Sequence, residues 1–257
     1  MSAPNRSKRR LLLSAGSLGA LWLTGCDRLS QTEWFPQVLR THESLSRSVH
    51  KVLGSRPSMA QEFSEADLSP MFRSNGTSMP EGATYQALVN SRFADWRLEV
   101  GGLVERPTKL SLAELRAMPR RTQITRHDCV EGWSAIGKWT GVPLSNVLSL
   151  VKPQASARYV VFHCADDMGG GLMPEYYYES IDMDDAMHPQ TILAYGLNGS
   201  DLPIPNGAPI RLRVERQLGY KHAKYVMRVE LVESFAKIGG GMGGYWEDYG
   251  YQWYAGI

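Results

Sequence analysis

Cys129 is the residue of this 257-residue chain with the greatest capacity for chemistry. It lies in the segment HDCVEGWSAIGKW, residues 127–139, which we expect to form a loop that follows a strand. A thiolate is a nucleophile and a ligand for soft metals, and nearby charges control its formation. Arg126 and His127 would lower the thiol pKa, whereas the neighbouring carboxylates would raise it. Composition therefore leaves open whether Cys129 is a metal ligand or an inert, buried small residue.

A zinc site is the first alternative that these residue types allow. His127, Cys129, His163 and Cys164 supply nitrogen and sulfur ligands, but their spacing departs from the usual pairs of cysteines two to four residues apart. Adjacent residues of a strand point to opposite faces, so His163 and Cys164 would not face the same ion. The pattern therefore argues against zinc.

Basic side chains are dense between residues 211 and 228. They are Arg211, Arg213, Arg216, Lys221, Lys224 and Arg228. Arginine and lysine bind phosphate through charge-assisted hydrogen bonds, but alternation with apolar residues is also typical of a solvated strand face. We assign Arg213 and Arg228 to a solvated face, and composition alone leaves the role of the other basic residues open.

The elements that must position these residues are mostly strands. Ser111 and Glu114 form a capping box, which predicts a short helix ending near Pro119. Regular alternation of strands with helices is missing, so we expect an α+β fold with mixed sheets and short helices. The predicted strands cover residues 96–104, 121–127, 158–164, 191–197, 208–214 and 225–233.

Two glycine-rich segments and an aromatic C-terminus complete the body of the chain. Residues 169–174 and 239–244 lack the features of phosphate-binding loops, and we interpret them as loops bordering a substrate entrance. The C-terminal residues, from Tyr245 onward, are predicted to pack across the body rather than to form a partner surface.

The N-terminus is typical of an export signal. Basic residues precede an apolar run of thirteen residues, Leu11–Leu23, which is too short to cross a membrane. Arg9-Arg10 resembles a twin-arginine signal, which exports folded, cofactor-loaded proteins, and Leu23-Thr24-Gly25-Cys26 resembles a lipobox. We predict a signal peptide at 1–25, a tether and wrapping segment at 26–70, and a catalytic domain at 71–257. The mature protein would be anchored by lipid on Cys26, in the periplasm or at the cell exterior.

Composition excludes several classes of protein. The chain is 43% hydrophobic and 21% charged, as expected for a globular domain with a substantial core. After residue 25 it holds 24 basic and 26 acidic residues, a net charge of −2, which argues against nucleic-acid binding. Three cysteines cannot all pair with one another, so a disulfide framework is excluded as the main source of stability.

The stretch 72–250 resembles the sulfite oxidase family of molybdenum enzymes, most closely the exported bacterial branch that includes methionine-sulfoxide reductase. Six segments occur in the order typical of that family. They are FRSNGTSMP (72–80), WRLEVGGLVERP (96–107), HDCVEGWS (127–134), ILAYGLNG (192–199), NGAPIRLRV (206–214) and LGYKHAKYV (218–226).

This resemblance implies the sulfite-oxidase, molybdopterin-binding fold, as a single catalytic domain without a C-terminal dimerisation domain. It implies that Cys129 binds the molybdenum of one Mo-molybdopterin and that Tyr195 is a catalytic tyrosine. Cys164 stands where the methionine-sulfoxide branch has a cofactor-contacting threonine. The further cofactor-binding residues implied are Asn75, Asn206, Arg211, His222, Ala223 and Lys224.

The activity implied is two-electron oxygen-atom transfer at a sulfur centre, with S-oxide reduction preferred. Sulfite oxidation is the alternative; it is disfavoured because Ser74 stands where sulfite oxidases place an arginine, although Lys221 could compensate. A lipoprotein binding module without turnover is the second alternative. We expect a small oxyanion or S-oxide as substrate, a separate haem-containing electron-transfer protein as partner, and a monomer.

Overall fold

The protein, seen here as a computed structural model, is described over residues 32, 34, 58–169 and 174–257. The chain divides into two compact units, Met1–Arg56 and Pro57–Ile257, and the second unit contains the fold. The predicted signal peptide and Cys26 lie outside the described residues. Among those residues, no helix is both long and apolar enough to cross a membrane.

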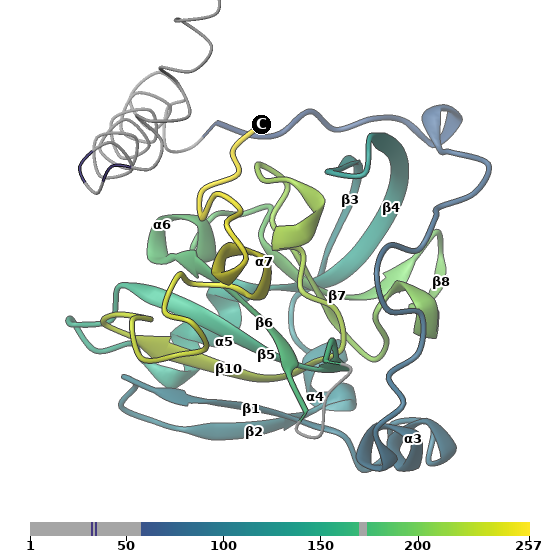
Figure 1. The fold of residues 1–257 in the computed structure, drawn as a ribbon. Coiled ribbons are helices and arrows are strands. Elements are labelled where there is room, and N and C mark those ends of the chain that lie inside the picture. The colour runs from purple at the N-terminus through teal and green to yellow at the C-terminus, as the bar shows by residue number, and fades with distance from the viewer. Residues whose placement is uncertain (1–31, 33, 35–57, 170–173) are drawn as a thin grey trace, which may run out of the picture. The chain divides into compact units, whose positions relative to one another are not determined.

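The first sheet of the Pro57–Ile257 unit has five strands in the order β2-β1-β10-β5-β6 (Figure 1). β1 runs parallel to β10, and the other neighbours are antiparallel, so the sheet is mixed. The strands are β1 (Arg97–Gly102), β2 (Thr108–Ser111), β5 (Tyr159–Asp167), β6 (Tyr176–Asp182) and β10 (Val226–Val232).

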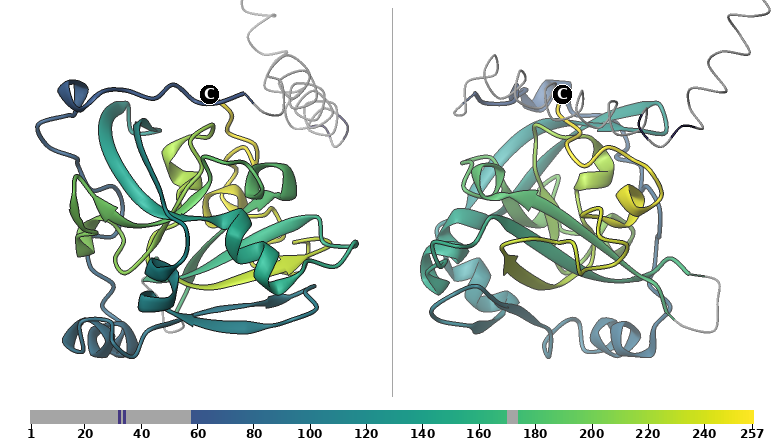
Figure 2. Two further views of the ribbon diagram at one scale, coloured as in Figure 1. Left: turned by 180° about the vertical axis from the view of Figure 1, so that it is seen from behind. Right: turned by 60° about the vertical axis from the view of Figure 1, so that its left-hand side comes forward.

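The second sheet is built around a long, curved hairpin, seen at full length in the left-hand view of Figure 2. Its strand order is β3-β4-β7-β8, and β9 pairs with β7. The strands are β3 (Arg121–Cys129), β4 (Trp133–Pro143), β7 (Ile192–Leu197), β8 (Ser200–Asp201) and β9 (Arg211–Arg213).

The helices are short. The predicted capping box is present: the Ser111 hydroxyl accepts a hydrogen bond from the Glu114 amide at 3.2 Å, and the Glu114 carboxylate accepts one from the Ser111 amide at 2.8 Å. The α-helices are α3 (Ala83–Asn90), α4 (Leu112–Ala117), α5 (Leu144–Val151), α6 (Met183–Ala186) and α7 (Tyr245–Asp248). The 3₁₀ helices are η1 (Glu65–Asp67), η2 (Ile204–Asn206) and η3 (Gly219–Lys221).

The main hydrophobic core covers both faces of β5. Val160, Val161 and Phe162 are consecutive and fully buried, as expected for a central strand packed on both sides. In α5, apolar residues at helical spacing, including Leu144 and Leu148, join the same core. These contacts fix the position of the C-terminal half of β5, which reaches the candidate site.

The predicted α+β architecture with mixed sheets and short helices is confirmed. The expected loop at 127–139 is wrong: only residues 130–132 form a turn, and β4 begins at Trp133. Residues 58–70 belong to the Pro57–Ile257 unit, and part of this segment contacts the hairpin. Glu62 forms a bridge with Thr125, and the Phe63 amide donates to the Ile124 carbonyl at 2.8 Å.

Candidate molybdenum-cofactor site

Cys129 is the last residue of β3 and pairs with Trp133 across the hairpin turn. The Gly132 amide donates to the Cys129 carbonyl at 3.0 Å, which closes the turn. Cys129 is 8% exposed and lines a cavity of about 190 Å³. The hairpin therefore presents a thiol at the wall of a cavity, where a metal could reach it.

The cavity is lined by segments that are distant in the sequence. Four predicted site residues meet there: Asn75, Cys129, His222 and Lys224. The other lining residues are Gly76, Thr77, Val130, Glu131, Asp166, Met168, Tyr177, Gly219, Tyr220, Trp246 and Tyr251.

Lys224 ties two of these segments together. Its Nζ donates to the carbonyls of Asn75 at 2.6 Å and Pro205 at 3.1 Å, and also to that of Thr77. Burial, aided by the Arg211 guanidinium, lowers the pKa of Lys224 to about 7. Three carbonyl acceptors match the three N–H groups of an ammonium, so the geometry favours the charged form.

His222 presents a nitrogen that can accept a hydrogen bond. Its Nε2 lies 3.0 Å from the Gln217 carbonyl oxygen, which can only accept, so the proton resides on Nε2. Nδ1 is then an acceptor, and it has no partner within the described part of the chain. Burial, aided by Arg213, lowers the pKa of His222 well below its ordinary value, so the ring is neutral.

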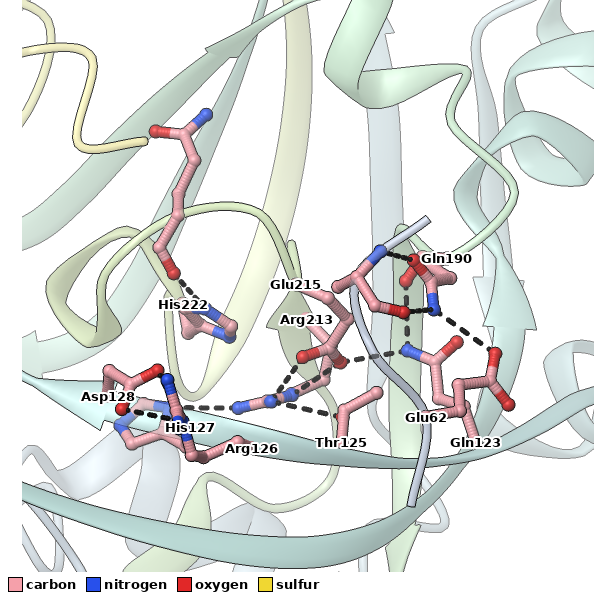
Figure 3. Close-up of polar contacts among 12 residues, drawn as sticks. Glu62, Gln123, Thr125, Arg126, His127, Asp128, Gln190, Arg213, Glu215 and His222 are labelled. Carbon is pink, nitrogen blue, oxygen red and sulfur yellow. Dashed lines mark hydrogen bonds and ion pairs between the residues drawn. The ribbon is translucent and has the colours of Figure 1, made fainter. Parts of the chain in front are cut away.

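A buried polar network lies behind His127 and extends to the N-terminal segment of the unit (Figure 3). Arg213 donates to Glu215 at 2.5 Å and to His127 Nδ1 at 2.9 Å. Gln123 continues the network through hydrogen bonds to Glu215 at 2.8 Å and to the Gln190 carbonyl at 2.9 Å. The prediction that Arg213 lies on a solvated face is wrong, because the side chain is completely buried in an ion pair. Arg228, by contrast, is 43% exposed, as predicted.

The charge around the Cys129 thiol differs from the sequence-based expectation. Burial raises the thiol pKa; the Glu131 amide opposes this shift, and the Glu131 carboxylate adds to it. The Arg211 guanidinium lowers the thiol pKa, but by less than burial raises it. Arg126 is instead paired with Asp128, and burial lowers the pKa of His127, which leaves that ring neutral. A metal would therefore have to displace the thiol proton when it binds.

Arg211 and Asn206 lie behind the cavity rather than in its wall. The Arg211 guanidinium donates to the carbonyls of Asn206 at 3.1 Å and His222 at 3.2 Å, and it lies 5.1 Å from the centre of the Trp139 ring. Arg211 Nε and Asn206 Nδ2 have no partners among the described residues. These two residues are therefore placed to support the His222 loop, with donors left available.

Ala223 and Cys164 are also buried behind the wall. The Ala223 carbonyl accepts from the Leu212 amide at 2.8 Å, which joins the His222 loop to β9. Cys164 belongs to the main core, and burial raises the pKa of its thiol well above the ordinary value. Cys164 is thus held as a neutral thiol on β5.

The structure does not bring Tyr195 to this cavity. β7 pairs with residues 139–143 of β4, whereas Cys129 pairs with Trp133 at the opposite end of that strand. Tyr195 is buried in the main core, and the Arg116 guanidinium lies 5.5 Å from its ring centre. The catalytic role that the resemblance implied for Tyr195 therefore has no support in this arrangement.

Sequence reasoning missed several residues of the wall, above all Asp166, Tyr177, Trp246 and Tyr251. Trp246 and Tyr251 stack with ring centres 5.4 Å apart, so the C-terminal segment forms one side of the cavity. The Tyr177 hydroxyl donates to the Tyr220 carbonyl. The dense aromatic residues after Gly244 were a signal, but local sequence did not show which surface they would cover.

The cavity-lining side chains fit a polar cofactor whose metal binds a cysteine sulfur. Three cavity-lining residues carry buried polar atoms without partners in the described structure: Asn75 Oδ1, Asp166 Oδ1 and His222 Nδ1. Unpaired buried polar atoms are costly unless a ligand satisfies them. No group of three or more His, Cys, Asp or Glu residues converges as a metal site within the described ranges, and Cys129 supplies the thiol of the cavity wall.

Comparison with known proteins agrees with this chemistry. Residues 85–237 match the family described as "Oxidoreductase molybdopterin binding domain". The chain belongs to this family. The resemblance to molybdopterin oxidoreductases, and the fold expected from it, are thereby confirmed.

Two bacterial relatives and one solved structure illustrate the similarity. A protein of Azospira oryzae, provisionally named protein-methionine-sulfoxide reductase subunit YedZ1, is 48% identical over 163 residues, covering 63% of this chain and 56% of the relative. The protein-methionine-sulfoxide reductase catalytic subunit MsrP of Ralstonia nicotianae is 38% identical over 178 residues, covering 66% and 53%. The chain thus spans about half the length of these relatives. The sulfane dehydrogenase SoxCD of Paracoccus pantotrophus aligns with a TM-score of 0.47 and 24% identity, over 55% of this chain and 39% of that one.

Proposed function

We propose that this protein reduces an S-oxide, with methionine sulfoxide as the substrate class, by two-electron oxygen-atom transfer at a molybdenum cofactor. The observation that carries the proposal is the Cys129 thiol in a cavity whose wall residues hold buried polar atoms without partners in the described part of the chain. Membership of the molybdopterin family and the names of the relatives support the same reaction class.

The residues divide into a metal ligand, cofactor-holding groups and a substrate wall. Cys129 would bind the metal as a thiolate, while Asn75 and His222 offer acceptors to the pterin. Lys224 would hold the Asn75 segment in place and add positive charge toward a phosphate. When bound, the cofactor supplies a two-electron redox centre that exchanges an oxygen atom with the substrate. The stacked Trp246 and Tyr251 would contact the apolar part of the substrate.

The charges of the cavity favour a neutral S-oxide over a sulfite dianion. Lys221 does not compensate for the missing arginine, because its Nζ is fully buried between Glu179 and Glu247. Ser74 donates its hydroxyl to the Pro205 carbonyl at 2.5 Å. Glu131 adds a carboxylate to the wall, and this group would repel a dianion. Sulfite oxidation therefore remains the second candidate.

Export and electron transfer complete the proposal. Arg9-Arg10 and the sequence ending at Cys26 support twin-arginine export followed by lipid anchoring outside the cytoplasm. Reduction of an S-oxide consumes two electrons, which we assign to a separate haem-containing donor. We propose that the protein acts as a monomer.

The direct test uses mature protein purified from a molybdenum-replete host. Oxidation of a reduced dye is followed with methionine sulfoxide and with other S- and N-oxides, in parallel with sulfite-dependent reduction of an acceptor. We expect about one molybdenum per chain and turnover with methionine sulfoxide. Turnover with sulfite alone would contradict the proposal, and a metal-free, inactive protein would indicate a binding module.

A further inference from the structure

We infer that Asp166 is the carboxylic acid that delivers a proton to the substrate oxygen, an inference that rests on the proposed function. Asp166 lies near the end of β5, where that strand reaches the cavity that also contains the Cys129 thiol. It is 4% exposed, and its Oδ1 has no hydrogen-bond partner among the residues described. Asp166 therefore belongs to the cavity wall and carries a buried oxygen whose hydrogen-bonding capacity is unused among the residues described.

The alternation of β5 separates Asp166 from its neighbour. Cys164 and Asp166 are buried on one face, whereas Asp167 is exposed. The Asp167 carboxylate accepts from the amides of Gly169 at 3.0 Å and Glu175 at 2.9 Å, so it supports a loop. Two adjacent aspartates thus occupy opposite environments, and only the buried one belongs to the cavity wall described here.

The surroundings of Asp166 favour the protonated acid. The titratable groups that interact electrostatically with the Asp166 carboxyl are the Lys224 ammonium, the Cys164 thiol and the phenols of Tyr85, Tyr177 and Tyr225. The thiol and the phenols are neutral, and the Lys224 protons are already donated to three carbonyls. Burial is the dominant effect and raises the pKa of Asp166 to about 7, against the opposing effects of a hydrogen bond from the Asp166 backbone amide and of the Lys224 charge.

The overall reaction requires such a group. An S-oxide, two electrons and two protons give a sulfide and water: the sulfur–oxygen bond breaks and two oxygen–hydrogen bonds form. The haem-containing donor supplies both electrons. Asp166 supplies one proton and the solvent supplies the other; the Asp166 carboxylate that remains beside Lys224 is then reprotonated from the solvent. An acid whose pKa lies near neutrality is well matched to this task.

Two other acidic groups of the wall are less suitable. The Tyr177 hydroxyl donates to the Tyr220 carbonyl, and burial raises its pKa well above the ordinary value. Glu131 is exposed and accepts a hydrogen bond from the Trp133 indole at 2.9 Å. Asp166 combines burial, a place in the wall and an oxygen that is unpaired within residues 58–169 and 174–257, so the geometry points to it.

The test compares Asp166→Asn with Asp166→Glu and with the matched control Asp167→Asn. In molybdenum-loaded protein, Asp166→Asn should lower kcat for methionine sulfoxide by about 100-fold, since general acids contribute roughly 10²–10⁴-fold. Asp166→Glu should recover at least part of the loss, and Asp167→Asn should match wild type. The wild-type kcat should decline above about pH 7, and this decline should vanish in Asp166→Asn.

Infrared difference spectroscopy on cofactor-free protein gives a readout that is independent of activity. The wild-type protein should show a protonated carboxyl band that titrates near pH 7 and is missing in Asp166→Asn. Loss of that band far below pH 7, or full activity of a metal-loaded Asp166→Asn variant, would overturn the inference while leaving S-oxide reduction intact. A metal-loaded wild-type protein that reduces no S-oxide would overturn the proposed function itself, and the inference with it. If Asp166→Asn fails to fold, the inference is tested by the wild-type protein alone, through the pH dependence of its kcat and the titration of its carboxyl band.

Discussion

At the scale of single residues, the candidate site stands out for the number of polar groups that it keeps buried. Asn75, Asp166 and His222 each hold an unpartnered atom within the described structure, and Lys224 is saturated by carbonyls. The unpartnered atoms reduce the stability of the cofactor-free protein, and a ligand that satisfies them would stabilise it. The site is thus prepared for a polar molecule at the expense of its own stability.

The effect of Asp166 on the free energy of unfolding can be measured. Its pKa in the folded protein is about 7, above the 3.8 of an unperturbed aspartate, so the folded state binds the proton more tightly. Its stabilising contribution is complete below about pH 4 and is lost as the pH rises to 7, at roughly 1.4 kcal/mol per pH unit. Urea unfolding of cofactor-free protein should show wild type losing about 2–3 kcal/mol between pH 5 and pH 8, relative to Asp166→Asn. An equal pH dependence in the two proteins would contradict this prediction.

Sequence identified some of these residues and missed others for physical reasons. The segments around Asn75, Cys129 and His222 were recognisable as motifs, and the structure brings them to one cavity. Arg213 was misassigned because alternation along a strand cannot distinguish a solvated face from a buried ion pair. Asp166 carries no local signal, since its environment is created by packing against distant segments.

At the scale of elements, the position of the Cys129 hairpin depends on how closely β4 and β7 approach each other. A Cβ on Gly141 would lie 2.3 Å from the Leu193 carbonyl oxygen and 2.6 Å from Ala194 Cα. Both atoms belong to the backbone of β7, so the contact cannot be relieved by a rotating side chain. A side chain at this position would force the two strands apart.

Gly141→Ala should therefore lower the free energy of unfolding by about 2 kcal/mol or more, as overpacked substitutions do. The matched control is Gly101→Ala in β1, where an added Cβ would meet no atom within 4 Å. Urea unfolding measures both variants, and the control should stay within about 0.5 kcal/mol of wild type. Equal stabilities would show that β4 and β7 can separate without penalty.

The Arg213–Glu215 pair connects β9 to β3 through His127 and Thr125. Both side chains are fully buried, so Arg213→Met leaves an unpaired carboxylate and should cost about 3–5 kcal/mol in unfolding free energy. Arg228→Met breaks a partly exposed pair with Glu230 and should cost less than about 1 kcal/mol. Similar losses in the two variants, measured by urea unfolding, would contradict the role assigned to burial.

Strands were predictable from either of two patterns. Alternation predicted β1 and β3, and apolar runs predicted β5 and β7, although β7 is buried throughout. β6 was missed because its buried residues include the polar Glu179, Ser180 and Asp182, and β4 was missed because its glycines and charged residues were interpreted as a loop.

At the scale of the whole unit, the C-terminal segment completes both the fold and the cavity. Its backbone pairs with the loop before η3: the Leu218 amide donates to the Ala255 carbonyl at 2.9 Å, and the Ile257 amide donates to that of Arg216 at 3.0 Å. α7 lies against β6 (Figure 1) and places Trp246 in the cavity wall. The segment therefore supports the loop that carries His222.

Deletion of residues 245–257 should consequently reduce molybdenum retention by at least about tenfold, the scale of effect seen when the supporting groups of a metal site are lost. Metal content after gel filtration is the measurement. The control is Tyr249→Ala, which removes a ring of the same segment that is 61% exposed and should leave retention unchanged. A deleted protein that retained its metal would show that the segment has no part in the site.

The contribution of distant segments explains what sequence could and could not establish about the whole site. The family and the candidate metal ligand Cys129 were accessible because the motifs around Cys129 and His222 are local. The wall formed by Trp246 and Tyr251 depends on how the chain end folds back, which local patterns do not encode. The same holds for the separation of Tyr195 from the cavity, which is set by the register of β7 on β4.

Molybdenum X-ray absorption tests the central claim most directly. Fully loaded wild-type protein should show one sulfur neighbour more than Cys129→Ser loaded under the same conditions, and Cys164→Ser should match wild type. A Cys129→Ser spectrum identical to that of wild type would contradict the account, as would loss of the sulfur neighbour in Cys164→Ser alone.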